Sequence, residues 1–574
     1  MEKMIRAKQK GTWEGIIILF VLAVILFYRA GYGMDISDET FYLSMAKRFS
    51  QGSLLFRDDW NTSQLYGLIL VPFYRIYSCL NGSNEGIVLF TRQIFVLAEF
   101  YVGCRWFLVL YRWKHDWKMA LLPAIGVMLY VRGNIINFSY YSMAALLFLL
   151  AIIEWIYGEL TQKRWHWILA GISYAVSVLC MPYEALLLPI LIILIWIENR
   201  ECAGQKIKCF VIGIFVAAII FLLYFGKWIP WMNLSKYLPL MFKDPEMEHE
   251  AVIMQLYDVA RYVLTSFMKY TWPVYIMTFF IVCLWKRIPY LNQRRNVVEW
   301  ILFLEFLLQT VYVRTFFESG TILVLFFYVV QMQILYREYR IPEFEKLFLW
   351  TGLLFSVVWV LGSNVGERSL NMGILIADIW GIAFLFYISK QQKSDKKIMC
   401  VQRQVAVSVM LFALLLVRMF DVYRDGTVQD LTYRVSEGIF KGICTEEKRG
   451  KIYERTVRYI KENTKENEKI VTLGCNPWFY LDANGMCSIY STWEVPGDEL
   501  AAEYYEMFPE KIPDNIFILG SAMDEYKSWR FSSHGSGEHK GEKIEVDGVY
   551  KKLIQDQKWK KITIEDSILY KRIP

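Results

Sequence analysis

Long apolar runs separated by short polar connections fill the first 420 residues of the chain. Many of these runs approach the roughly 20 residues that a helix needs to cross the hydrocarbon core of a bilayer. The pattern therefore predicts a mainly α polytopic membrane protein with about 13 membrane-spanning helices. The predicted spans are 13–31, 87–110, 119–131, 140–157, 165–181, 185–197, 209–225, 267–285, 297–313, 321–335, 347–361, 372–388 and 405–420.

The first run, 13–31, follows a basic segment, which is also the charge order of a secretory signal peptide. Its apolar stretch is too long for a signal peptide, and no small-residue cleavage site follows it. We therefore predict that this segment is an uncleaved first span.

The connection between the first two spans, 32–86, contains two apolar segments that are shorter than a span. In the first, the apolar residues within 41–49 recur at helical spacing with Lys47 and Arg48 on the other side. This spacing predicts an amphipathic helix that lies in the membrane interface. The second segment, 65–80, has 16 residues and is also predicted to lie at the membrane surface.

Lysine and arginine are shared unequally between the two sides that the predicted spans define. The connections on the side of the N-terminus carry 24 of these residues, whereas the four short turns on the other side carry three. Because positive residues gather in cytoplasmic connections, the N-terminus is predicted to be cytoplasmic. The connections 32–86 and 226–266 and the polar tail are then outside. A spanning segment at 65–80 would place the basic connections outside, so we predict that it does not span.

The composition becomes polar after residue 420, and the apolar segments there have the lengths of strands and short helices. We predict an extracytoplasmic α/β domain over residues 421–574, attached to a transmembrane domain over residues 1–420. A segment with Ser, Gly and His at 531–543 is predicted to be a mobile loop. The predicted helices are 446–463 and one that begins at Asn476-Pro477, and the predicted strands are 469–473, 488–490, 516–519, 560–564 and 567–570.

The composition supports a multi-pass protein of the cell membrane. Hydrophobic residues make up 55% of the chain, above the roughly 45–50% of soluble domains. The net charge of +7 follows from the basic connections, so no nucleic-acid partner is indicated. The ten cysteines are scattered, and no metal or redox motif is present. A disulfide between Cys475 and Cys487 is conceivable, but the pattern favours two free thiols.

Three acidic residues, Asp35, Asp38 and Glu39, follow directly after the first span. Carboxylates against a membrane cost desolvation free energy unless they are solvated, paired or in use, so this cluster is a candidate functional site. An ordinary solvated loop is the alternative. A second acidic run at 244–250, which includes Glu246, lacks the spacing of metal ligands, and we predict a solvated loop there.

The stretch Asp38-Glu39-Thr-Phe-Tyr42 resembles the Asp-Glu-x-x-Tyr motif in the first outer loop of the GT-C superfamily of polytopic glycosyltransferases. This superfamily includes the protein O-mannosyltransferases and the aminoarabinose transferases of lipid A. The resemblance continues through residues 65–85 and through Arg92 near the head of the second span. It covers about the first 110 residues, and the remainder is similar in architecture only.

The resemblance implies transfer of a sugar from a polyprenyl-phosphate donor to a glycan, lipid or protein acceptor at the outer face, usually with inversion. Such a displacement needs a carboxylate that takes the proton of the acceptor hydroxyl, and a cation that holds the departing phosphate. We predict that Asp38 is the general base. Glu39 is expected to orient Asp38 or the acceptor, and Asp35 to assist them or to bind a divalent cation.

The substrate-binding side chains are expected on the outer side of the membrane. Arg92 is the first candidate for the phosphate, because guanidinium binds phosphate oxygens in a bidentate manner. A snorkelling arginine is the alternative for this residue. The other candidates are Lys236, Arg314 and Arg368 for the phosphate, Asn137, Tyr140 and Tyr141 for the sugar, and Tyr42 for the substrate in general. Aromatic residues also gather at membrane interfaces without a ligand.

The chain differs from the superfamily pattern in two respects, and each changes the reaction that we expect. Metal-dependent members carry a second acidic motif in the next outer turn, whereas residues 132–141 contain no acid. We therefore expect transfer without a metal cofactor. No tripeptide resembles the oligosaccharyltransferase motif, so transfer of a whole oligosaccharide to asparagine is not expected.

Two other classes of function remain open at this point. A transporter or lipid flippase would place ionisable residues near the membrane midplane. Few ionisable residues lie near the middle of the predicted spans, namely Glu99, Glu154, Glu305 and Asp378. A membrane scaffold without catalytic activity is the third class, and it would tolerate replacement of the acidic cluster.

Overall fold

A computed structural model shows the fold of the chain. It describes residues 2–198, 202–243, 252–267, 271–288, 294–314, 320–339, 343–362, 369–391, 397–493, 499–519, 546, 548–556, 558–564 and 567–573.

Helices dominate the structure up to residue 420, which confirms the mainly α class. Each predicted span overlaps one of these helices. Six of the helices in the described ranges are long and apolar enough to cross a membrane, and four others are apolar but shorter. The helices that overlap the predicted spans are α1 (Glu2–Arg29), α4 (Ile87–Lys114), α5 (Trp117–Leu129), α6 (Tyr140–Thr161), α7 (Arg164–Cys180), α8 (Leu187–Glu198), α9 (Ala203–Phe225), α12 (Trp272–Leu284), α14 (Arg295–Arg314), α15 (Gly320–Leu335), α16 (Glu343–Gly362), α17 (Leu370–Gln391) and α18 (Lys397–Phe420).

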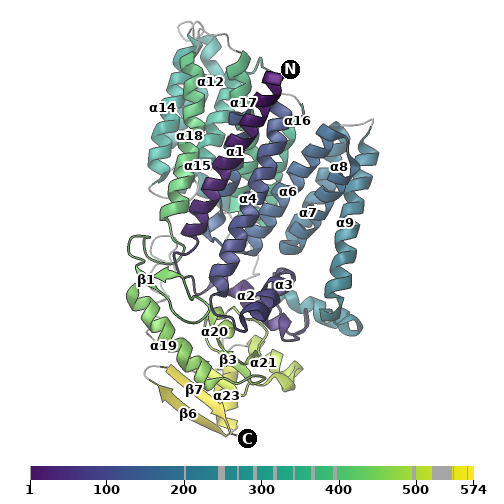
Figure 1. Ribbon diagram of the computed structural model, residues 1–574, viewed down its shortest axis with the longest axis vertical. Coiled ribbons are helices and arrows are strands. Elements are labelled where there is room, and N and C mark those ends of the chain that lie inside the picture. The colour runs from purple at the N-terminus through teal and green to yellow at the C-terminus, as the bar shows by residue number, and fades with distance from the viewer. Residues whose placement is uncertain are drawn as a thin grey trace.

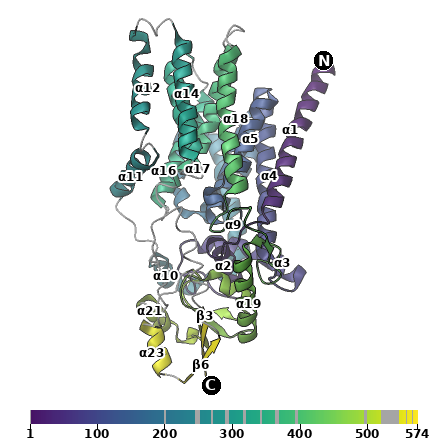
Figure 2. The same cartoon turned by 90° about the vertical axis from the view of Figure 1, so that its left-hand side faces the viewer.

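These helices run side by side along the long axis of the molecule (Figure 1). Helices α7, α8 and α9 form a group beside α6, and α12 and α14 lie at another edge of the bundle (Figures 1 and 2). The N-terminus lies at the end of the bundle opposite the C-terminal region (Figure 1).

The C-terminal α/β region is built on a five-stranded mixed sheet with the strand order β4-β3-β5-β7-β6. β3 pairs in parallel with β4 and β5, whereas β7 pairs antiparallel with β5 and β6. The predicted strand at 488–490 is wrong in position, because the chain pairs with β3 two residues earlier. The strands are β3 (Lys469–Thr472), β4 (Met486–Cys487), β5 (Asn515–Ile518), β6 (Trp559–Ile564) and β7 (Ser567–Arg572), with β1 (Tyr433–Arg434) and β2 (Cys444–Thr445) forming a separate pair.

Short helices complete the C-terminal region and the long connection after α9. The two predicted helices of the C-terminal region are confirmed as α19 and α20, whereas α21 and α23 were not predicted. The predicted loop 531–543 and the acidic run 244–250 lie outside the described residues. The helices are α19 (Glu447–Asn463), α20 (Pro477–Asp482), α21 (Glu499–Met507) and α23 (Gly548–Asp556) in the C-terminal region, and α10 (Leu234–Tyr237), α11 (Val252–Arg261) and η7 (Tyr262–Phe267) in the long connection.

Two helices of the first connection, α2 (Asp38–Ser50) and α3 (Gln64–Asn81), lie between the helix bundle and the C-terminal region (Figure 1). The expectation that Lys47 and Arg48 form an exposed face of α2 is wrong, because both side chains are buried. The ammonium of Lys47 donates hydrogen bonds to backbone carbonyls of the C-terminal region. Arg48 forms an ion pair of 3.2 Å with the buried Asp59.

Further contacts join α2 and its following loop to the segment after β4. The hydroxyl of Ser44 donates a hydrogen bond of 2.8 Å to Thr492. Trp60 stacks on Tyr490 with ring centroids 5.4 Å apart. The C-terminal region is therefore packed directly against the helix that begins at Asp38.

The buried Lys47 predicts a rise in stability at alkaline pH. Burial lowers the pKa of Lys47 to about 8 from 10.5, and Asp482 partly opposes this effect. Between these values the unfolded chain binds more protons than the folded chain, so the free energy of unfolding increases with pH. The expected gain is about 3 kcal/mol. Thermal unfolding of the protein and of Lys47→Met should therefore diverge with increasing pH, and parallel curves would contradict the assignment.

Candidate active site

Asp38 is the first residue of α2, at the junction between the helix bundle and the C-terminal region. Its Oδ2 accepts a hydrogen bond from the hydroxyl of Tyr423 and lies 3.1 Å from Nη1 of Arg424. Within the described chain, no group donates to its Oδ1. The side chain is 19% exposed. One carboxylate oxygen is thus held in place, and the other is accessible.

Several charges act on this carboxyl group. Burial raises the pKa of Asp38 above its ordinary value, and the nearby Asp35 adds to the rise. Arg424, the hydrogen bond from Tyr423 and Arg132 all act in the opposite direction. A carboxylate with a raised pKa is a stronger base, and it is suited to accept a proton from a hydroxyl group.

Asp35 is held by the start of α2. Its Oδ1 accepts hydrogen bonds from the backbone N–H and the hydroxyl of Ser37, at 3.0 and 2.7 Å. Its Oδ2 accepts the backbone N–H of Glu39 at 2.9 Å. Because N–H groups at the start of a helix have no partner inside the helix, a carboxylate here stabilises the first turn. The geometry gives Asp35 a structural role rather than a place among metal ligands.

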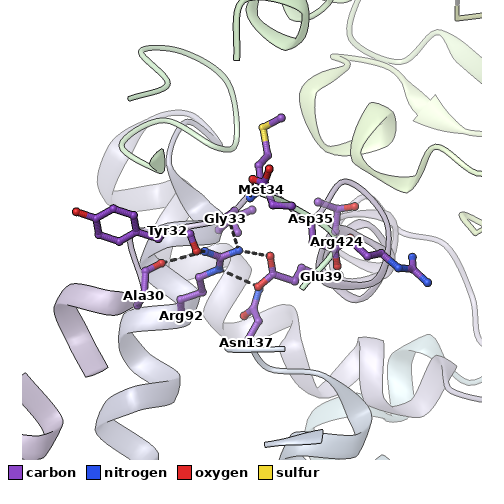
Figure 3. Close-up of polar contacts among 12 residues, drawn as sticks. Ala30, Tyr32, Gly33, Met34, Asp35, Glu39, Arg92, Asn137 and Arg424 are labelled. Carbon is purple, nitrogen blue, oxygen red and sulfur yellow. Dashed lines mark hydrogen bonds and ion pairs between the residues drawn. The ribbon is translucent and has the colours of Figure 1, made fainter. Parts of the chain in front are cut away.

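Glu39 pairs with Arg92, and both side chains are buried (Figure 3). Nε and Nη2 of Arg92 bind the two carboxylate oxygens of Glu39, the first at 2.8 Å. Its remaining N–H groups donate to the carbonyl oxygens of Ala30, Tyr32 and Gly33 at 2.8 to 3.1 Å. All five donors of Arg92 are thus in use within the chain, which disfavours the expected role in phosphate binding.

Asn137 lies beside this ion pair (Figure 3). Its side-chain Oδ1 accepts the backbone N–H of Phe138 at 2.7 Å, and its Nδ2 has no partner among the described residues. Arg424 lies on the other side of Glu39 and points away from Arg92 (Figure 3). The acidic cluster therefore has two faces, a buried face at Glu39 and an accessible face at Asp38.

Arg132 is the cation that the turn between α5 and α6 brings near Asp38. It follows α5, and its guanidinium lies 3.6 Å above the ring centroid of Tyr141. The rings of Tyr140 and Tyr141 are 3.9 Å apart, and Tyr42 packs against Tyr140 at 5.5 Å. The structure thus brings Tyr140 and Tyr141, both predicted for the sugar, together with Tyr42, predicted for the substrate, in one aromatic cluster beside the carboxylate.

The other predicted cations are not placed at Asp38. Lys236 is exposed on α10, and no contact joins it to Asp38 in the described chain. The side chain of Arg314 and the whole of Arg368 lie outside the described residues, as does Glu246. Within the described ranges, no group of three or more His, Cys, Asp or Glu side chains is arranged to hold a metal ion.

No protein-family model matches the chain, and no curated protein matches it. Among solved structures, the apo crystal structure of the Archaeoglobus fulgidus oligosaccharyltransferase matches with a TM-score of 0.48 and 12% identity. The match covers 89% of this chain and 70% of that protein.

Three residues of the candidate site were not predicted from the sequence. Arg132 had a usable signal, because it is one of three basic residues in the four short turns predicted to lie outside, and unlike Arg314 and Arg368 it was counted only for the topology. Tyr423 and Arg424 follow directly after the last helix of the bundle. Their sequence separation from Asp38 exceeds 380 residues, and no pattern in a single sequence indicates such a contact.

Proposed function

We propose that the protein is a membrane glycosyltransferase that moves a sugar from a polyprenyl-phosphate donor to a cell-envelope acceptor at the outer face. The observation that supports this most strongly is the surroundings of Asp38. An accessible carboxylate oxygen lies beside a tyrosine cluster and near Arg132, at the end of a helix bundle where a lipid-linked substrate would present its head group. The resemblance of the first outer loop to the GT-C superfamily favours the same reaction.

In the proposed reaction, Oδ1 of Asp38 takes the proton of an acceptor hydroxyl. The hydroxyl oxygen forms a bond to the anomeric carbon, and the bond from that carbon to the phosphate oxygen breaks with its electron pair on the phosphate. A single displacement of this kind inverts the anomeric centre. Arg132 stabilises the negative charge on the departing polyprenyl phosphate. Tyr42 and Tyr141 provide aromatic faces for the sugar ring.

Asp35 and Glu39 have supporting functions in this proposal. Asp35 fixes the first turn of α2, and the Glu39–Arg92 pair fixes that turn to α4 and to the backbone at 30–33. Neither carboxylate is then a direct participant. The reaction needs no metal in this proposal, because the cation at the phosphate is an arginine.

A transporter or flippase is the second candidate, and one observation favours it. Asp378 is buried in α17, and neither of its carboxylate oxygens has a hydrogen-bond partner in the described chain. An ionisable residue inside a membrane helix is a common feature of transport pathways. A flippase would redistribute the polyprenyl-phosphate sugar between the leaflets without consuming it.

The test uses the purified chain in liposomes with radiolabelled polyprenyl-phosphate sugars and extracted envelope glycans, lipids and proteins. We expect label in one acceptor class, and an equal amount of released polyprenyl phosphate. In the same assay, Asp430→Asn is the matched control for Asp38→Asn, the variant without the proposed base, because Asp430 is an exposed aspartate in the C-terminal region. Leaflet exchange of intact donor without release of polyprenyl phosphate would contradict the proposal and support a flippase.

Replacement of Arg132 tests the phosphate contact. Arg132→Gln should lower kcat/KM for the donor by roughly 10²-fold, because one charged donor at the developing phosphate charge is lost. Arg132→Lys should retain part of the activity, since it keeps the charge but not the bidentate geometry. Initial rates at several donor concentrations measure both values. The exposed Arg455 supplies the control variant Arg455→Gln, and an equal loss in that variant would contradict the assignment.

A further inference from the structure

The segment 421–426, here called the strap, joins the last helix of the bundle to the C-terminal region. Its first residue is fixed from two other elements. Arg29 on α1 donates to the carbonyl oxygens of Met419 and Asp421 at 2.9 and 2.7 Å. Asn134, in the turn after α5, donates to the same carbonyl of Asp421 at 2.6 Å. The bundle end of the strap is thus held by buried side chains of α1 and of the turn that carries Arg132.

The other end of the strap is fixed at Asp425. One carboxylate oxygen of Asp425 accepts the N–H of Met34 at 2.6 Å and the hydroxyl of Thr445 at 2.8 Å. The other oxygen lies 2.8 Å from Nη1 of Arg449 on α19. These contacts join the strap to the loop before α2 and to the C-terminal region at one buried residue.

Between these two ends, Arg424 has a backbone conformation that is uncommon for its type. Its φ of +51° lies in the left-handed region, which residues other than glycine rarely adopt. Arg449 donates to the carbonyl oxygen of Arg424 at 2.8 Å and so supports this conformation. Backbone strain of this kind gathers at functional sites, where the surrounding structure maintains it.

Two side chains of the strap contact Asp38. Both Tyr423 and Arg424 contact Oδ2 of Asp38, and Arg424 also donates to the hydroxyl of Ser37. We infer that the strap is a positioning element, in which Tyr423 and Arg424 hold Oδ2 so that Oδ1 alone receives the acceptor's proton. This inference rests on the proposed glycosyltransferase function. Neither strap residue needs to touch a substrate, so both are positioning residues.

The strap should also affect how the rate of sugar transfer depends on pH. Arg424 and the hydroxyl of Tyr423 both lower the pKa of Asp38, so loss of either should raise that pKa. Because the base acts in its ionised form, the acid limb of the rate profile should then move to higher pH. The other titratable or charged groups around Asp38 are Asp35, Glu39 and Tyr42 from its own segment, and Arg132, Tyr140 and Tyr141 from the turn and helix beyond α5.

The experiment compares Tyr423→Phe and Arg424→Gln with the parent chain in the transfer assay. Each variant should lower kcat by about 10- to 100-fold at nearly unchanged donor KM, because the base is misplaced while the substrate contacts remain. Each should also shift the acid limb upward. Arg424→Lys should leave the acid limb near its parent position and still lower kcat, since a lysine keeps the charge without the planar geometry.

The chain offers a matched pair of controls in the same region, Tyr433→Phe and Arg434→Gln. Tyr433 hydrogen-bonds Glu454, and Arg434 is exposed. Thermal unfolding of every variant identifies any that fails to fold. If Tyr423→Phe and Arg424→Gln both fold and both keep the parental kcat and acid limb, the inference is overturned and the proposed function stands. A parent chain that transfers no sugar would overturn both.

Discussion

Asp38→Asn is expected to lower kcat for sugar transfer by about 10³-fold, because the variant loses the group that accepts the acceptor's proton. The substitution preserves the size of the side chain, and its amide oxygen can still accept the hydrogen bond from Tyr423. The side chains of Asp38 and of its ion-pair partner Arg424 are both partly exposed. Loss of the Asp38 charge therefore leaves no deeply buried cation without its counter-ion. Initial rates with saturating donor and acceptor give the value directly.

The neighbouring acids provide the controls for this measurement. Glu39→Gln and Asp35→Asn act on buried carboxylates whose contacts are structural, so their effects should follow thermal stability. Asp38→Asn should instead lose activity at nearly parental stability. Parental kcat in Asp38→Asn would show that another group accepts the proton, and the proposed reaction would then fail.

The sequence predicted the helices of the bundle well because apolar length is a local property. The same holds for β3, β5, β6 and β7, each of which carries apolar or β-branched residues within a few positions of the chain. β4 was misplaced because it is only two residues long and is defined by its pairing with β3. Local periodicity contains no information about such a pairing.

The burial of Lys47 and Arg48 shows a second limit of the sequence. Charged residues on one side of an apolar helix normally indicate a solvated face. Here the C-terminal region covers that side and supplies carbonyl acceptors to both residues, from more than 400 positions away. The carboxylate that pairs with Arg48 is that of Asp59, in the loop after α2. The acceptors exist only in the folded chain, so composition predicted the wrong environment for a correctly predicted helix.

The three acids after the first span show a third limit. Their spacing indicated a site, but it did not distinguish the partly exposed Asp38 from the two buried carboxylates. That distinction depends on partners from distant segments, since Arg92 engages Glu39, while the strap engages Asp38. A side chain whose donors are all satisfied by its own chain is poorly available to a ligand, which is why Arg132 replaces Arg92 in the proposed reaction.

Arg92→Gln is expected to destabilise the protein by about 3–5 kcal/mol, the usual cost of leaving a buried charge without its partner. The variant loses both contacts to Glu39 and three contacts to backbone carbonyls. Denaturant unfolding in mixed micelles measures the change. Glu510→Gln is the control, because the pair of Glu510 with Arg57 is exposed and should contribute under about 1 kcal/mol.

The loss of stability in Arg92→Gln should depend on pH, and the direction of this dependence should identify the unpaired Glu39 carboxylate as its cause. Burial raises the pKa of Glu39, and Arg92 opposes that rise, so removal of Arg92 raises the pKa further. With a folded-state pKa above its unfolded value, Glu39 destabilises the variant increasingly as pH rises, and protonation relieves the cost at acidic pH. Adding Glu39→Gln to Arg92→Gln should remove this pH dependence and recover part of the loss. The loss of stability that remains in the double variant, at all pH values, measures the three contacts of Arg92 to backbone carbonyls. If the double variant were as unstable as Arg92→Gln, the whole loss would come from these carbonyl contacts and none from the Glu39 charge.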